Sequence, residues 1–235
     1  MKNNKREINS YRYERKFNIP KHLASYSLAL IRSNFSNLSE LYEERQVNSL
    51  YYDTYNLNFA RQNLNGNSNR KKIRLRYYGD QKILKDPQIE IKSKFGHVGT
   101  KKVIEINKNT KNKNKFYSFE QLNNIYSLDL NQDTSLIGLR PVLFVSYLRK
   151  YFISKCNRFR FTLDENIVFK AIDFTLNEDF IIQKQFFNAN ESILEIKYNF
   201  KDEINELINS LNLPFRISRY SKYIIGLSVT GKLKI

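Results

Sequence analysis

Several strand-like segments of this chain separate charged from apolar side chains at every second position. In residues 72–77, Lys72, Arg74 and Arg76 alternate with apolar neighbours. Three other segments place an acid two positions before a base: Glu14 and Lys16, Glu90 and Lys92, Glu195 and Lys197. A spacing of two puts both side chains on the same face of a strand. The pattern predicts strands with one charged face and one apolar face.

Such charged faces are suited to phosphate chemistry. Arginine and lysine bind phosphate oxygens through charge-assisted hydrogen bonds. A single carboxylate can hold a hard divalent ion that takes its other ligands from water and phosphate, and ion and cations together stabilise phosphoryl transfer. The seven glycines are scattered and form no phosphate-binding loop. A phosphate site in this chain must therefore be built from side chains, although each charged face alone could also be an ordinary solvated surface.

The elements that must position these residues are mostly strands. Alternation predicts them near residues 10–19, 46–53, 71–79, 87–95, 98–107, 142–154, 157–164, 166–173, 179–187, 191–199 and 222–229. Helical spacing predicts helices over 22–34, 116–126 and 201–211. Residues 63–69 and 108–115 have the composition of loops.

This order of elements indicates an α+β fold, with an antiparallel β-barrel and helices packed on its outside. If the charged faces line the barrel, the apolar faces point outward and the helices cover them. Neither predicted loop is long enough for a domain linker, so we expect residues 1–235 to form a single domain.

The composition narrows the class of protein further. The chain has 40 Lys and Arg against 23 Asp and Glu, a net charge of +17 that favours polyanionic partners. One cysteine and two histidines exclude metal sites built from those residues. No apolar run is long enough to span a membrane and the N-terminus is polar, so we expect no membrane span, no secretory signal and a cytoplasmic location.

Eight short motifs, in order, resemble those of one family. They are YRYERKF (11–17), VNSLYYDT (47–54), KIRLRYY (72–78), IEIKSK (89–94), YLRKYF (147–152), RFRFTLD (158–164), LEIKY (194–198) and SRYSKY (218–223). The chain resembles, over residues 11–227, the VTC domain, the catalytic domain of vacuolar transporter chaperone polyphosphate polymerases in the triphosphate tunnel metalloenzyme superfamily. The resemblance implies an antiparallel tunnel in which the ATP γ-phosphate is moved onto a growing polyphosphate chain, with Mn²⁺ or Mg²⁺ as cofactor.

The resemblance also implies roles for individual residues. The cations of the catalytic set are Lys16, Arg74, Arg76, Lys92, Arg149 and Lys222. The phosphate-binding set adds Lys102, Arg160, Lys197, Arg219 and Ser221. Glu195 occupies the position of the family's metal-binding glutamate, and Glu90 and Glu14 either support the metal or orient neighbouring cations. The implied partners are ATP and inorganic polyphosphate or triphosphate.

One departure from the family pattern weighs against a two-carboxylate metal site on the first strand and against a simple triphosphatase. Related tunnel enzymes often begin with a Glu-x-Glu-x-Lys strand, whereas Arg12 stands here at the first position. The alternatives are hydrolysis of triphosphate or a nucleoside triphosphate, a non-catalytic polyphosphate binder, and a nucleic-acid-binding protein. Of these alternatives, we expect nucleic-acid binding the least.

Overall fold

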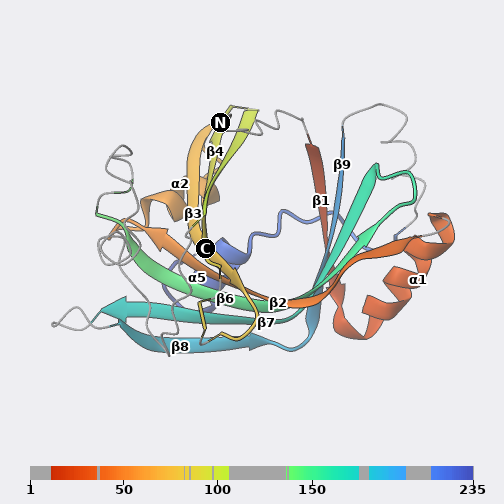
Figure 1. The fold of residues 1–235 in the computed structure, drawn as a ribbon. Helices are drawn as coiled ribbons and strands as arrows, with labels where there is room; N and C mark the ends of the chain where they lie inside the picture. Colours follow the sequence, from red (N-terminus) through yellow and green to blue (C-terminus); the bar gives the residue numbers. More distant parts are fainter. Residues whose placement is uncertain are drawn as a thin grey trace. The chain divides into compact units, whose positions relative to one another are not determined.

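The computed structural model describes residues 12–35, 38–81, 83–84, 86–96, 98–105, 136, 138–174, 180–199 and 213–234. Over these residues the protein is mainly antiparallel β-sheet (Figure 1). The strands are β1 (Arg12–Pro20), β2 (Ser39–Asp53), β3 (Asn69–Tyr78), β4 (Gln88–Phe95), β5 (Val98–Glu105), β6 (Arg140–Ile153), β7 (Phe159–Phe174), β8 (Phe180–Asn188) and β9 (Glu191–Asn199). The helices are the 3-10 turn η1 (Lys21–Leu23), α1 (Ala24–Asn34), α2 (Asn58–Leu64) and α5 (Lys222–Val229).

The strands form one sheet in the order β1-β9-β7-β6-β2-β3-β4-β5, with β8 added beside β7. Among the described strands this hydrogen-bonded order does not return from β5 to β1, so backbone pairing does not close the sheet as a barrel. No helix in the described part of the chain combines the length and the apolar character that crossing a membrane needs.

The chain divides into two compact units, and β2, β6 and β7 contribute residues to both. Unit 1 comprises Met1–Glu43, Lys150–Asp164 and Asn190–Arg219. Unit 2 comprises Glu44–Arg149, Glu165–Ala189 and Tyr220–Ile235.

Unit 1 has its core between α1 and the apolar faces of β1, β7 and β9. Phe17, Phe161 and Leu194 are buried in one cluster with Ile31 of α1 and with Phe35, which directly follows the helix. The ring of Phe35 lies 5.0 Å from that of Phe161, centroid to centroid. The expected arrangement, a helix covering the apolar face of charged strands, is therefore present in this unit.

Unit 2 keeps its main core on one face of β2, β3 and β4. Leu50, Ile73, Leu75 and Ile89 are almost completely buried there. The register pairs Tyr51 with Arg74 and Arg74 with Glu90, so these polar side chains share the opposite face.

The helix α5 corrects the strand predicted over 222–229. Its eight residues are mostly apolar, and a run this short does not distinguish a buried strand from a buried helix. Ser221 caps it by accepting a hydrogen bond from the Ile224 amide. A Cβ at Gly226 would lie 2.6 Å from side-chain atoms of Leu143 and Phe169, so only glycine allows α5 to pack this closely on β6 and β7.

The other predicted elements agree with the structure except in detail. The strands predicted over 157–164 and 166–173 are the single strand β7, which is irregular between Ala171 and Ile172. The short helix α2 was not predicted and overlaps the predicted loop over 63–69. The helices predicted over 116–126 and 201–211 and the loop over 108–115 lie outside the described residues.

Candidate phosphate-binding sites

The first candidate site lies on the polar face of unit 2. We call Tyr51, Arg74, Arg76, Glu90, Lys101 and Tyr147 the Glu90 cluster. Strands β2, β3 and β4 supply Tyr51, Arg74 and Glu90 as neighbours across the sheet. Strand β5 adds Lys101, which pairs with Lys92 and reaches Glu90 diagonally. Four strands thus bring an acid, cations and tyrosines to one face.

Three cations contact the Glu90 carboxylate. Arg74 donates from Nε and Nη2 to Oε2, at 2.7 Å and 2.5 Å. Lys101 Nζ lies 2.8 Å from Oε1. Arg76 is held more loosely, with Nη1 3.6 Å from Oε1. The Glu90 side chain is only 4% exposed, so these contacts replace water around its charge.

The cations fix the ionisation of Glu90. Burial alone would raise the pKa of its carboxyl group, but Arg74, Arg76 and Lys101 outweigh burial and hold that pKa well below its ordinary range. Burial also acts against the charge of Arg74, yet Tyr51, Glu90 and Tyr147 raise the pKa of the guanidinium above its ordinary value. Glu90 and Arg74 are therefore a fixed ion pair across the neutral pH range.

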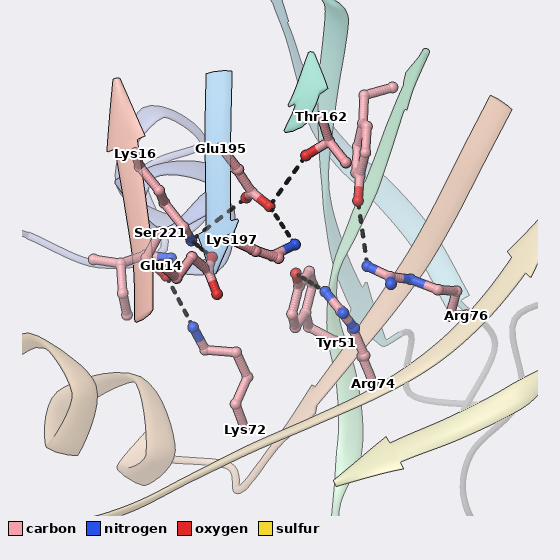
Figure 2. A network of polar contacts seen from close by, with 12 residues as sticks. Glu14, Lys16, Tyr51, Lys72, Arg74, Arg76, Thr162, Glu195, Lys197 and Ser221 are labelled. Carbon is pink, nitrogen blue, oxygen red and sulfur yellow. Dashed lines mark hydrogen bonds and ion pairs between the residues drawn. The ribbon is translucent and has the colours of Figure 1, made fainter. Parts of the chain in front are cut away.

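Tyrosines surround the arginines of this cluster. Tyr51 accepts a hydrogen bond from Arg74 Nη1 at 3.1 Å (Figure 2). Tyr147 accepts one from Arg76 Nη2 at 3.3 Å. The Tyr147 ring also lies under two buried cations, with Lys222 Nζ 4.6 Å and the Arg149 guanidinium 5.1 Å from its centroid. Tyr147 thus connects three cations of the expected catalytic set.

The start of α5 is attached to this face by hydrogen bonds. Lys72 donates to Ser221 Oγ at 3.0 Å, and the Tyr223 hydroxyl donates to Asp53. Burial, helped by Asp53, raises the pKa of Tyr223 well above its ordinary value, so the hydroxyl keeps its proton and stays a donor. Asp53 also accepts backbone N–H bonds from Phe59 and Ala60 at the start of α2. One buried carboxylate therefore positions both α2 and α5.

The second candidate site lies on the charged face of unit 1. We call Glu14, Lys16, Thr162, Glu195 and Lys197 the Glu195 cluster (Figure 2). The register pairs Lys16 with Glu195, Glu14 with Lys197 and Thr162 with Glu195, so all five side chains share one face.

Two lysines and a threonine contact the Glu195 carboxylate. Lys197 Nζ lies 2.9 Å from Oε2 and Lys16 Nζ lies 3.6 Å from Oε1. Thr162 donates to Oε2 at 3.5 Å. Lys16 also contacts Glu14 at 3.0 Å. The Glu195 side chain is 7% exposed, so it is nearly as buried as Glu90.

The Glu195 cluster fits a divalent ion better than the Glu90 cluster does. Among the described residues no three acids, cysteines or histidines gather into a ligand set. Magnesium-type ions need only one or two carboxylates when phosphate and water complete the shell. Glu195, with Glu14 sharing Lys16, offers that donor set, and its lysines are flexible point charges that can turn toward phosphate.

The remaining expected site residues divide between the units. Arg160 pairs with Lys197 across β7 and β9, so it shares the face of the Glu195 cluster, and Arg219 is an exposed residue of unit 1. Lys92 shares the face of Glu90. Lys102 pairs with Ile91, which places it on the opposite face. Lys101, rather than Lys102, contacts Glu90.

Sequence reasoning missed Lys101, Tyr147 and Thr162 as members of the clusters. The sequence held a signal for Lys101: Gly96 stands between two strand-like segments and marks a tight turn. Pairing the two strands outward from this turn places Lys101 opposite Lys92 and places Lys102 on the other face of the sheet. Thr162 and Tyr147 fall on the charged faces of quoted motifs but carry no charge themselves.

Comparison with known proteins identifies the family. The family model described as the VTC domain matches residues 11–230, nearly the whole chain and both compact units. The chain belongs to the VTC domain family. This confirms the family expected from the eight motifs and supports a polyphosphate- or triphosphate-binding enzyme of phosphate transfer.

One solved structure supports the fold. A predicted adenylate cyclase from Vibrio parahaemolyticus is 16% identical with a TM-score of 0.50, over 92% of this chain and 98% of that one. A second, from Bacillus halodurans, is 11% identical with a TM-score of 0.47, over 91% and 96%. No curated protein sequence matches the chain significantly. The VTC domain chain thus has the antiparallel fold of the triphosphate tunnel class, as expected.

Proposed function

We propose that this VTC domain protein is a polyphosphate polymerase that moves the γ-phosphate of ATP onto the end of a growing polyphosphate chain. The observation that supports this most is the Glu90 cluster. The buried Arg76 and the partly buried Arg74 share one face of the sheet with an acid and a lysine in a chain of the VTC domain family. Closely set arginines on a rigid sheet are suited to the oxygens of a phosphate chain.

The proposed step requires charge stabilisation rather than proton transfer. A terminal oxygen of the acceptor chain bonds to the γ-phosphorus, the bond from that phosphorus to the β–γ bridging oxygen breaks, and ADP leaves with the electron pair. The acceptor oxygen is already ionised at neutral pH, so no side chain has to act as a base. Cations that neutralise the phosphate oxygens supply the catalysis.

The side chains divide this task. Glu90 fixes the orientation of Arg74, so the N–H groups of Arg74 that do not bind Glu90 point in a fixed direction toward phosphate. Arg76 has longer contacts and can turn toward phosphate. Glu90 then orients cations and holds no metal. Lys101 takes the role that the resemblance implied for Lys102.

Glu195, with Glu14 in support, would hold Mg²⁺ or Mn²⁺ in unit 1. When bound, the ion neutralises phosphate oxygens and fixes their orientation. Lys16 and Lys197, which contact these carboxylates, would then be available to donate to phosphate.

The test is to incubate the purified protein with ATP and Mn²⁺ and to separate the products on a gel stained for polyphosphate. We expect a ladder of chains in the wild type and a much weaker one in Arg74→Ala, with Lys71→Ala as the matched control from the opposite face of β3. Release of orthophosphate without any polyphosphate chain would contradict the polymerase and indicate a triphosphatase. Binding of polyphosphate with no turnover of ATP would contradict both enzymes.

A further inference from the structure

Two buried hydrogen-bond donors without a partner lie side by side in unit 2. Ser49 Oγ and Arg76 Nε form no hydrogen bond, and neither atom is accessible to solvent. The register pairs Ser49 with Arg76 across β2 and β3, so both side chains project from the same face. An unpaired buried donor costs about 1–3 kcal/mol. Two such donors side by side need an explanation, and a bound ligand that supplies the missing acceptor is one.

The surroundings show which kind of acceptor fits. An arginine Nε–H can only donate, and a serine hydroxyl donates readily to an anion. The neighbours of Arg76 are Glu90 at 3.6 Å and the Tyr147 hydroxyl at 3.3 Å, and both contacts are long. Arg74 on the same strand is held at 2.5 Å and 2.7 Å. Arg76 is thus held less tightly than Arg74, and it lies opposite Ser49 across the two strands.

We propose that Ser49 is a further substrate-binding residue and that, with Arg76, it forms a subsite for one oxygen of a phosphate chain. This rests on the proposed function and adds a residue to it. When the chain binds, Arg76 turns outward and its Nε–H and the Ser49 hydroxyl donate to the same phosphate oxygen. In the free protein both donors lack a partner, and the bound phosphate oxygen supplies one to each.

The chain offers a matched control for Ser49. Ser192 is also a fully buried strand serine whose hydroxyl has no hydrogen-bond partner. It pairs with Ile19, on the side of the strands that packs the unit 1 core, away from the Glu195 cluster. Removing either hydroxyl deletes an unpaired buried donor, but only Ser49 lies beside an arginine.

The experiment titrates sodium tripolyphosphate into the metal-free protein by calorimetry and melts each variant without ligand. We expect Ser49→Ala to weaken tripolyphosphate about 10-fold, as for one charge-assisted hydrogen bond, while its melting temperature equals or exceeds that of the wild type. Ser192→Ala should melt in the same way and bind like the wild type. Loss of affinity with unchanged or higher stability distinguishes a binding role from a structural one.

Combining Ser49→Ala with Arg76→Lys tests the shared oxygen. Because both donors serve one acceptor, the double variant should lose less affinity than the product of the two single losses. Wild-type affinity in Ser49→Ala would overturn the subsite and leave the proposed function intact, and the donors would then hold a water only. Fully independent losses would overturn the shared oxygen. A wild-type protein that binds no tripolyphosphate would overturn the proposed function itself.

Discussion

The two clusters are built alike and differ in their cations. Each has one nearly buried glutamate on a charged strand face, Glu90 at 4% and Glu195 at 7% side-chain exposure. Arginines and a lysine hold Glu90, whereas lysines and a threonine hold Glu195. A guanidinium is a rigid planar donor, whereas an ammonium is a point charge on a flexible stem. The difference indicates that Glu90 is a fixed structural anion and Glu195 is a carboxylate able to change partners.

The largest expected effect is on catalysis at Glu195. The Glu195→Gln substitution keeps the shape of the side chain and removes the charge that would hold a divalent ion. We expect polyphosphate synthesis with Mn²⁺ to fall by about 1,000-fold or more, on the scale of losing one essential electrostatic contact, while calorimetry shows tripolyphosphate still binding. Wild-type turnover in this variant would show that Glu195 is not the essential ligand.

The next effect is on stability at Glu90. The Glu90→Gln substitution leaves Arg74 and Arg76 as buried charges without their anion, which costs about 3–5 kcal/mol when one partner of a buried pair is removed. We expect this loss in the free energy of unfolding, measured with urea. The matched Glu195→Gln variant should lose far less, because its lysines can turn to solvent. Equal losses in the two variants would remove the distinction between the clusters.

Smaller effects are expected from the arginines of β3. Arg74→Ala and Arg76→Ala should each remove one or two charge-assisted hydrogen bonds, about 1.5–3 kcal/mol apiece in transition-state stabilisation. Turnover at saturating and low ATP measures this loss, and circular dichroism confirms the fold. Lys71→Ala on the same strand, with its side chain on the other face, should behave as wild type. Equal effects at Arg74 and Lys71 would contradict the assignment of faces.

The smallest effect is the acid dependence of stability. The pKa of Glu90 is lower in the folded than in the unfolded chain, so its ion pairs contribute fully above the unfolded value, about 4.3. Their contribution decreases as the pH falls below that value toward the folded pKa. Urea unfolding between pH 6 and pH 3 should show a decline that is shallower in Glu90→Gln. A decline of the same slope in both proteins would contradict the lowered pKa.

The sequence predicted the faces of the strands because a period of two needs no tertiary information. Arg74 with Glu90 and Lys16 with Glu195 are cross-strand pairs of the kind that the alternation implied. The sequence did not predict that Lys101, and not Lys102, shares the face of Glu90, because the face of each lysine depends on the register of one hairpin.

The short helices were less predictable for a different reason. Packing decides the structure of α5, where Gly226 allows close contact with Leu143 and Phe169, and its eight residues are too few for a helical period to appear. The first turn of helix α2 donates backbone hydrogen bonds to the buried carboxylate of Asp53, a residue that precedes the seven residues of the helix. The residue pattern of a short segment carries no information about packing or hydrogen-bond partners elsewhere in the chain.

The central claim is that this VTC domain protein binds phosphate chains through closely set donors rather than through its general positive charge. The most direct test is a thermal melt with tripolyphosphate or duplex DNA at low and moderate salt. Tripolyphosphate at about 100 times its dissociation constant should add roughly 2.7 kcal/mol, a rise of several degrees that largely survives moderate salt. Duplex DNA should give a smaller rise that is lost steeply as salt displaces it. Equal stabilisation by both ligands, lost together as salt increases, would contradict the claim.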